Sequence, residues 1–307
     1  MSWMDTVWIL LRQIGIMFAF MAIGWIMTKG KWLTNQGTKD LSNLLLRVVV
    51  PIIIIKSFIT ENTSEKITGL FISFGLALLA ITIAAVISGL VFSKRSVVNQ
   101  FGTAFSNAGF FGIPIVSALY GDEAVFYIAS FIMFIFFFQW TYGVFLFTRD
   151  KTIFQPKKLF MNPVVVAFLL GMILFFTQLP IPDVVTSAMG MITPLNTPIA
   201  MIILGSYMAK DKLVKIFTNS QAYLVSVFRL LVIPLVTIAI FTLLPAEVSV
   251  IRTAVLISAI APVGVNVAVF AGLYDQDYNQ SVRIVCLSTI LCVATIPLLV
   301  MLTEWIW

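Results

Sequence analysis

Two long apolar stretches of the sequence each bring Asn, Gly and Pro close together. The first reads AFSNAGFFGIPIVSALYG at 104–121 and the second reads LISAIAPVGVNVAVFAGL at 256–273. Proline removes one backbone donor and frees the carbonyl one turn earlier. Glycines such as Gly109, Gly112 and Gly264 let the backbone leave the helix at low steric cost. The N–H groups freed at the new helix starts attract anions, so these stretches predict an anion-binding site built from backbone dipoles.

Polar side chains accompany both interruptions. Asn107 and Asn266 add neutral amide donors, and Pro114 and Pro262 mark the two positions. Donors without a counter-charge suit a carboxylate that must bind and later leave. Two plainer readings stay open: the asparagines could only cap the interrupted helices, and the interruptions could be kinks packed by small residues.

Five further polar residues lie within apolar stretches. Arginine inside a membrane span is a functional candidate, and Arg229 could hold the carboxylate of a substrate or extend toward the nearer membrane surface. For Arg47 we favour the surface, and we interpret Arg12 as an interfacial anchor. Gln139 and Tyr142 are expected to form helix–helix hydrogen bonds or to support the site from behind.

Several kinds of chemistry lack their residues. The sequence has no His, and its 13 acidic residues all lie at the ends of apolar stretches or between them. No carboxylate is therefore placed to carry a proton or sodium ion at mid-membrane depth. Cys286 and Cys292 are six apart and point to different sides of a helix, so they are expected to be unpaired apolar residues. We expect no enzyme, no cofactor and no metal site.

The composition explains the setting of these residues. Of 307 residues, 60% are hydrophobic and 10% charged, and the mean hydropathy is +1.06. Soluble domains have about 25% charged residues, so a polytopic membrane protein is predicted. A membrane-spanning helix needs about 20 apolar residues. By this measure ten spans are predicted, near 6–28, 39–59, 68–92, 101–120, 124–148, 163–180, 184–208, 221–244, 251–273 and 283–306.

The positive charges are distributed unevenly between the loops. Loops after the odd-numbered spans contain 13 Lys and Arg residues, and the opposite loops contain only Lys56, Lys66 and Arg252. Positive charge marks cytoplasmic loops, so both termini are predicted to lie outside. The 13 residues are Lys29, Lys31, Lys39, Lys94, Arg95, Arg149, Lys151, Lys157, Lys158, Lys210, Lys212, Lys215 and Arg283.

Proline positions suggest an internal duplication. Pro198 follows Pro51 by 147 positions, and Pro262 follows Pro114 by 148. Five spans in each half is an odd number, so the second copy would enter the membrane inverted, as in many transporters. The prediction is an all-α protein with a five-plus-five inverted repeat (1–150 and 151–307) and broken, crossing helices four and nine. Coincidence of the prolines is the alternative.

Several stretches resemble the auxin efflux carrier family, whose bacterial members include malate- and malonate-type permeases. The resemblance covers essentially the whole chain and is most specific in the fourth and seventh spans. The short connection TRDKTIFQPKKLFMNP resembles a compact prokaryotic permease rather than the plant members, which have a long loop there. The matching stretches are FMAIGWIMTKGKWLT, LSNLLLRVVVPIIII, SNAGFFGIPI, NPVVVAFLLGMIL, PLNTPIAMIILGSYMA and SAIAPVGVNVAVFAGLY.

The resemblance implies a division of labour between the helices. Spans one, two, six and seven would form a scaffold that often dimerises, and spans three to five and eight to ten a moving transport domain. Spans four and nine would cross at Pro114 and Pro262. The family's binding positions would fall on Asn107 and Asn266, with Gln139 in support.

We therefore expect a secondary carrier for a small organic anion, such as malate, malonate or an auxin-like acid, in the bacterial inner membrane. A sodium- or proton-coupled carrier of the same fold is the alternative, and a channel or receptor is a weaker one. The partners expected are the anion, the lipid bilayer and a second copy of the chain, with no nucleic acid. The predicted substrate-binding residues are Asn107, Gly109, Pro114, Gln139, Arg229, Pro262, Gly264 and Asn266.

Overall fold

The protein is a bundle of long helices in the computed structural model, which describes residues 3–92, 96–149, 161–211, 213–244 and 249–307. Within these residues every regular element is a helix, and the only β-type pairing is one isolated antiparallel bridge, Ser106 to Val263. The all-helical prediction is confirmed. Six loop cations used above (Lys94, Arg95, Lys151, Lys157, Lys158, Lys212), the acidic residues Asp150 and Glu247, and the predicted boundary at 150/151 lie outside the described residues.

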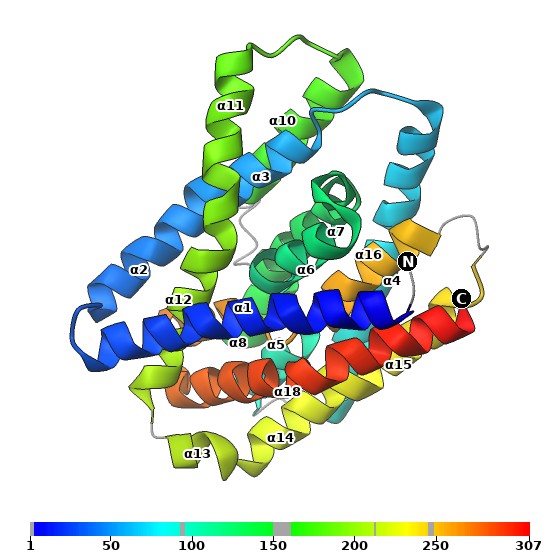
Figure 1. Ribbon diagram of the computed structural model, residues 1–307. Coiled ribbons are helices and arrows are strands. Elements are labelled where there is room, and N and C mark those ends of the chain that lie inside the picture. The colour runs from blue at the N-terminus through cyan, green and yellow to red at the C-terminus, as the bar shows by residue number, and fades with distance from the viewer. Residues whose placement is uncertain (1–2, 93–95, 150–160, 212, 245–248) are drawn as a thin grey trace.

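Six helical stretches of this part of the chain are long and apolar enough to cross a membrane, as judged by length and composition. Figure 1 places both chain ends at the same end of the bundle. Ten crossings and an inverted repeat stay predictions. The six stretches are Met4–Lys29, Ser64–Val91, Asp122–Thr148, Asp183–Lys210, Ser220–Phe241 and Tyr278–Ile306, and shorter apolar helices cover Ala108–Tyr120, Pro163–Thr177 and Ser249–Ile260.

Helix starts follow the local sequence. Thr63, Asn219 and Asp277 each accept a backbone N–H two or three residues into the helix that follows them, which satisfies a donor with no intrahelical partner. The α-helices are α1 (Trp3–Lys29), α2 (Asn35–Leu44), α3 (Val50–Ser57), α4 (Ser64–Val91), α5 (Val97–Ala104), α6 (Ile113–Tyr120), α7 (Val125–Phe138), α8 (Val144–Thr148), α10 (Pro163–Thr177), α11 (Asp183–Ile192), α12 (Asn196–Lys210), α13 (Leu213–Phe217), α14 (Ser220–Val227), α15 (Ile233–Phe241), α16 (Ser249–Ile260), α17 (Asn266–Leu273) and α18 (Tyr278–Ile306).

Three prolines follow a π-helical turn by two positions. The turns are η1 (Leu45–Val49) before Pro51, η2 (Ala108–Gly112) before Pro114 and η7 (Phe228–Val232) before Pro234. In each turn the residue just before the proline donates its N–H five positions back, as Ile113 does to Ala108 O. The wider turn accommodates the proline ring, which would otherwise clash with the carbonyl four residues earlier.

The prolines paired by spacing do not share a local conformation. Pro51 follows a π-turn, whereas Pro198 lies in α12 after the 3-10 turn Thr193–Leu195. Pro114 lies within α6, whereas Pro262 lies between α16 and α17. The spacing alone therefore does not establish the duplication.

Helices α1 and α12 pack with their backbones in contact. A Cβ atom on Gly24 would lie 2.1 Å from Ile202 O, and one on Gly205 would lie 1.9 Å from Met21 O. Both distances are shorter than any real contact, so glycine at both positions is what lets these helices approach so closely. The contact at Gly24 and Gly205 therefore holds α1, at the start of the chain, against α12.

Aromatic rings join α3 to α7 and α10. Phe58, which is fully buried, lies edge-on to Phe126 at 5.0 Å and to Phe168 at 5.3 Å between ring centroids. Phe175 lies 5.0 Å from Phe126 and completes the cluster. Edge-to-face pairs of this kind add about 0.5–1.5 kcal/mol each beyond the area they bury.

A chain of side-chain amides joins α5, α14 and α18. Asn99 Nδ2 donates to Gln221 Oε1 at 3.1 Å, and Gln280 Nε2 donates to Asn99 Oδ1 at 2.9 Å. Asn219 Nδ2 donates to Gln280 Oε1 at 2.7 Å. These bonds fix α5, the first half of an interrupted helix, against two continuous ones.

Candidate functional site

Two interrupted helices meet at the centre of the molecule. One stops at the end of α5 and resumes in η2, and the other stops at the end of α16 and resumes in α17. The extended residues between the halves pair reciprocally: Asn107 N–H donates to Pro262 O at 2.8 Å, and Gly264 N–H donates to Phe105 O at 3.0 Å. We call this arrangement the crossing. The sequence predicted both interruptions correctly.

The crossing differs from expectation at one proline. Pro262 lies within it, but Pro114 lies seven residues beyond Asn107, in the first turn of α6. The expectation that the helices cross at Pro114 is therefore wrong. The π-turn η2 absorbs this proline without ending the helix, so the interruption falls earlier.

The two glycines expected at the site have different surroundings. A Cβ atom on Gly264 would lie 3.0 Å from Ser106 O, a tight contact, so a side chain there would require the paired segments to move slightly apart. At Gly109 nothing lies within 4 Å of the added Cβ. Gly264 therefore favours the close approach of the two segments, and Gly109 leaves open space.

A small pocket of about 20 Å³ lies at the crossing and brings together five of the eight predicted binding residues. We call it the crossing pocket. A cavity needs roughly 10–15 Å³ to hold one water molecule, so no organic acid fits in this conformation. Its polar lining consists of Ser106, Asn107, Gln139 and Asn266, its glycines are Gly109 and Gly264, and Leu46 and Val50 contribute apolar surface.

The amide groups of the crossing pocket are not all satisfied. Asn266 Nδ2 donates to Gln139 Oε1 at 2.7 Å. Asn107 is 5% exposed, and its Nδ2 finds no hydrogen-bond partner among the described residues. A buried donor without a partner costs about 1–3 kcal/mol. This donor is therefore available to a ligand.

Backbone donors of η2 face the same region. The first bond of this turn runs from Phe111 N–H to Asn107 O at 2.9 Å. The N–H groups of residues 108–110 precede that bond and have no intrahelical acceptor. They form the positive end of the helix that continues through α6, next to the free amide of Asn107.

Arg229 contacts the crossing through the ends of the two helices that enter it. The side chain is 1% exposed, and its Nε donates to Ala261 O at 3.1 Å while Nη1 donates to Thr103 O at 3.3 Å. Both carbonyls belong to the C-terminal ends of helices entering the crossing, where the dipole is negative. Arg229 is not in the lining of the crossing pocket, so the structure directs it to backbone carbonyls rather than to a ligand there.

The remaining polar candidates are placed as follows. Arg12 and Arg47 are exposed. Tyr142 accepts a hydrogen bond from Gln100 Nε2 at 3.0 Å, which is the predicted helix–helix bond. Gln139 is bound to Asn266 and thus supports the crossing. Cys286 and Cys292 are buried and unpaired, as predicted.

The comparison with protein families agrees with this architecture. The model of the membrane transport protein family, that of the auxin efflux carriers, matches residues 9–300. The chain belongs to this family. It is therefore a multi-pass membrane transporter. Comparison with curated proteins gives no match.

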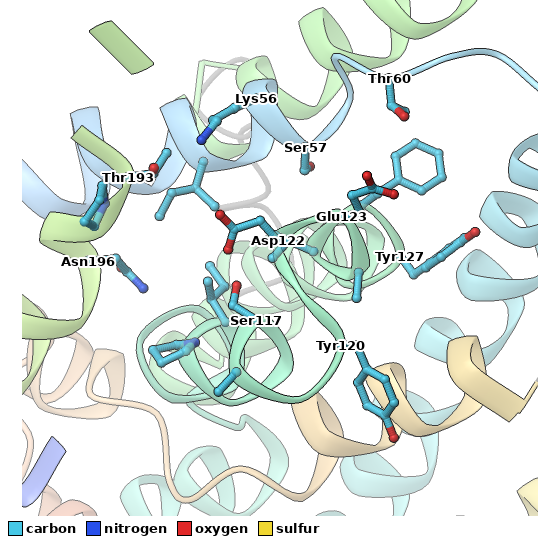
Figure 2. A pocket seen from close by; sticks show the side chains of 18 of the residues that line it. Lys56, Ser57, Thr60, Ser117, Tyr120, Asp122, Glu123, Tyr127, Thr193 and Asn196 are labelled. Atoms are coloured by element: carbon cyan, nitrogen blue, oxygen red, sulfur yellow. The ribbon is translucent and has the colours of Figure 1, made fainter. Parts of the chain in front are cut away.

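The transporter also contains a much larger cavity, of about 680 Å³, which we call the outer cavity. It extends from the helix ends at Thr60, Glu123 and Val250 to Pro114 and Asn196 in the interior. Figure 2 shows Lys56 of α3 and Asp122, just after α6, directed into the same space. The acidic residues were predicted at span ends, and none of them was predicted beside a cavity.

Asn196 of this membrane transporter lies where the outer cavity meets the crossing. It lines the outer cavity, and its Nδ2 donates to Gly109 O, a residue of the crossing pocket, at 3.2 Å. Asn196 was not among the residues predicted for the site, although an amide between two prolines in PLNTP was a usable signal. Across the described residues, no group of three or more His, Cys, Asp or Glu could hold a metal ion.

Proposed function

We propose that the protein is a secondary carrier for a small organic anion, a carboxylate such as malate, malonate or an auxin-like acid, which binds at the crossing. This proposal rests on the free, buried Nδ2 of Asn107 beside the N–H groups of residues 108–110, which have no intrahelical acceptor. Among the described residues, no Asp or Glu lines the crossing pocket to oppose a negative charge. Neutral donors and a helix start bind an anion without trapping it.

The proposal includes alternating access. The scaffold would comprise α1, α2–α3, α10 and α11–α12, which also form a homodimer contact, and the other helices would move against it. The meeting of two broken helices, joined by the antiparallel bridge from Ser106 to Val263, supports a five-plus-five inverted repeat, because such carriers place discontinuous helices at the repeat interface. In the conformation described, the outer cavity is open between the two groups.

An ion pair joins the two groups of helices away from the outer cavity. Arg283 of α18 donates from Nε to Asp211 Oδ2 at 2.6 Å, and Asp211 directly follows α12. An ion pair between the two groups at one end and an open cavity at the other is the arrangement expected of one half of a transport cycle. A channel would require both ends to be open together.

The carrier is expected to have both termini outside the cell. In a background with Cys286→Ala and Cys292→Ala, the variants Ser2→Cys and Ile306→Cys should each react with an impermeant maleimide on intact cells. A Cys introduced at Lys31, in a loop predicted to be cytoplasmic, should react only after permeabilisation. Protection of both terminal positions would contradict the charge-based topology.

Anion binding is expected to depend on Asn107. Asn107→Ala removes the free donor and should weaken carboxylate binding by about 1–3 kcal/mol, as measured by calorimetry with malate, malonate and indole-3-acetate. Asn107→Asp keeps the shape but adds a negative charge and should weaken binding further. The exposed Asn43→Ala is the matched control. Tighter binding in Asn107→Asp would mean that the substrate is a cation.

A further inference from the structure

The side-chain amide of Asn196 has one hydrogen-bonded atom and one atom without a hydrogen-bond partner. It is 2% exposed at the start of α12, and its Nδ2 donates to Gly109 O at 3.2 Å. Its Oδ1 is buried and lacks a hydrogen-bond partner among the described residues. Figure 2 shows the side chain at the wall of the outer cavity.

The orientation of this amide is fixed by its partner. A backbone carbonyl only accepts hydrogen bonds, so the NH₂ end of Asn196 must face Gly109 O. A flipped amide would place two acceptors against each other. The free end is therefore an acceptor, and buried acceptors left unpaired are uncommon in native proteins.

The place of Asn196 between two cavities gives this free acceptor a role. The crossing pocket holds about 20 Å³ and the outer cavity about 680 Å³, and the contact between Asn196 and Gly109 lies between them. An organic anion too large for the first must extend into the second. A substrate held by Asn107 would then lie against Asn196.

The unpaired groups of the two asparagines require opposite hydrogen-bonding partners on that substrate. The free group of Asn107 is a donor, which suits a carboxylate, whereas the free group of Asn196 is an acceptor, which a carboxylate would leave unpaired or repel. Building on the function proposed above, we propose that Asn196 is a specificity-determining residue that selects organic anions also carrying a hydrogen-bond donor, a hydroxyl or an amino group. A site that pairs a buried group with a substrate hydroxyl rejects the analogue lacking it.

The experiment compares acids that differ only in the donor. Purified carrier in liposomes is loaded with malate, and counterflow of labelled malate is competed with malate or succinate and, in a second pair, with lactate or propionate. The wild type should prefer the hydroxylated member of each pair by about tenfold or more. Asn196→Leu, similar in size but apolar, should reduce the preference to within about threefold by weakening only the hydroxylated acid.

Thr193→Val is the matched control, because Thr193 lines the same cavity whereas the hydrogen bond to Gly109 O comes from Asn196, and its preference should equal that of the wild type. Equal affinity of the wild type for both members of each pair would overturn the role of Asn196, and so would an unchanged preference in Asn196→Leu. The wild-type comparison needs no variant, so it decides the question even if Asn196→Leu fails to assemble. Failure of every acid to bind the wild type would instead refute the organic-anion function itself.

Discussion

Arg229→Met is expected to reduce transport at least tenfold in purified, reconstituted protein. The substitution leaves Ala261 O and Thr103 O without their donors, at a cost of about 1–3 kcal/mol for each buried acceptor. It also leaves the negative ends of α5 and α16 uncompensated, close to where an anion must bind. Because tenfold corresponds to about 1.4 kcal/mol, the loss of one such bond suffices.

For Arg229→Met, the transport rate is a more sensitive measurement than thermal stability. Burying an arginine charge is itself costly, so its removal offsets part of the stability lost with the two hydrogen bonds. We therefore expect only a small change in melting temperature and a large change in transport rate. Arg229→Lys keeps the charge but cannot match the planar fork that reaches two carbonyls. It should recover anion affinity without recovering the rate. Wild-type flux in Arg229→Met would show that the bridge between the two helices is dispensable.

Transport of the anion is expected to follow the membrane potential. Without a carboxylate in the crossing pocket to balance the substrate, moving a monoanion transfers one negative charge. Each charge couples to the potential by about 2.3 kcal/mol per 100 mV, or roughly 50-fold in the equilibrium gradient. An inside-negative potential should therefore drive export and oppose uptake, unless a second anion is exchanged.

The measurement is uptake into liposomes clamped with a potassium gradient and valinomycin at fixed pH. Arg229 is buried beside the crossing, so any movement of its charge through the field would partly cancel that of the substrate. Flux that ignores the clamp and follows an imposed pH gradient would mean proton symport and contradict this coupling.

The helix interruptions could be predicted from sequence because their cause is local. Asn, Gly and Pro within an apolar stretch weaken the helix wherever it lies, and both breaks occur there. The partners of Arg229 could not be predicted, because they are carbonyls 32 and 126 positions away. Sequence shows a buried cation but not which backbone groups become free beside it.

Pro114 illustrates a different limit. A proline in a helix can end it, kink it or follow a π-turn, and the residue types alone do not distinguish these outcomes. The position of Asp122 beside the outer cavity could not be predicted either, because that cavity is formed by α3, α6 and α12 together.

The π-turns before Pro51, Pro114 and Pro234 make chain length as important as residue type. Each turn amounts to one residue inserted into an α-helix, and each residue of a helix accounts for a rotation of about 100°. A chain one residue shorter in Ala108–Gly112 would keep an apolar helix of ordinary composition. It would nevertheless turn every later side chain of α6, including those lining the outer cavity, away from its present neighbours. A single-residue deletion at any of these three places would therefore change the facing of a whole helix segment, which no single substitution restores.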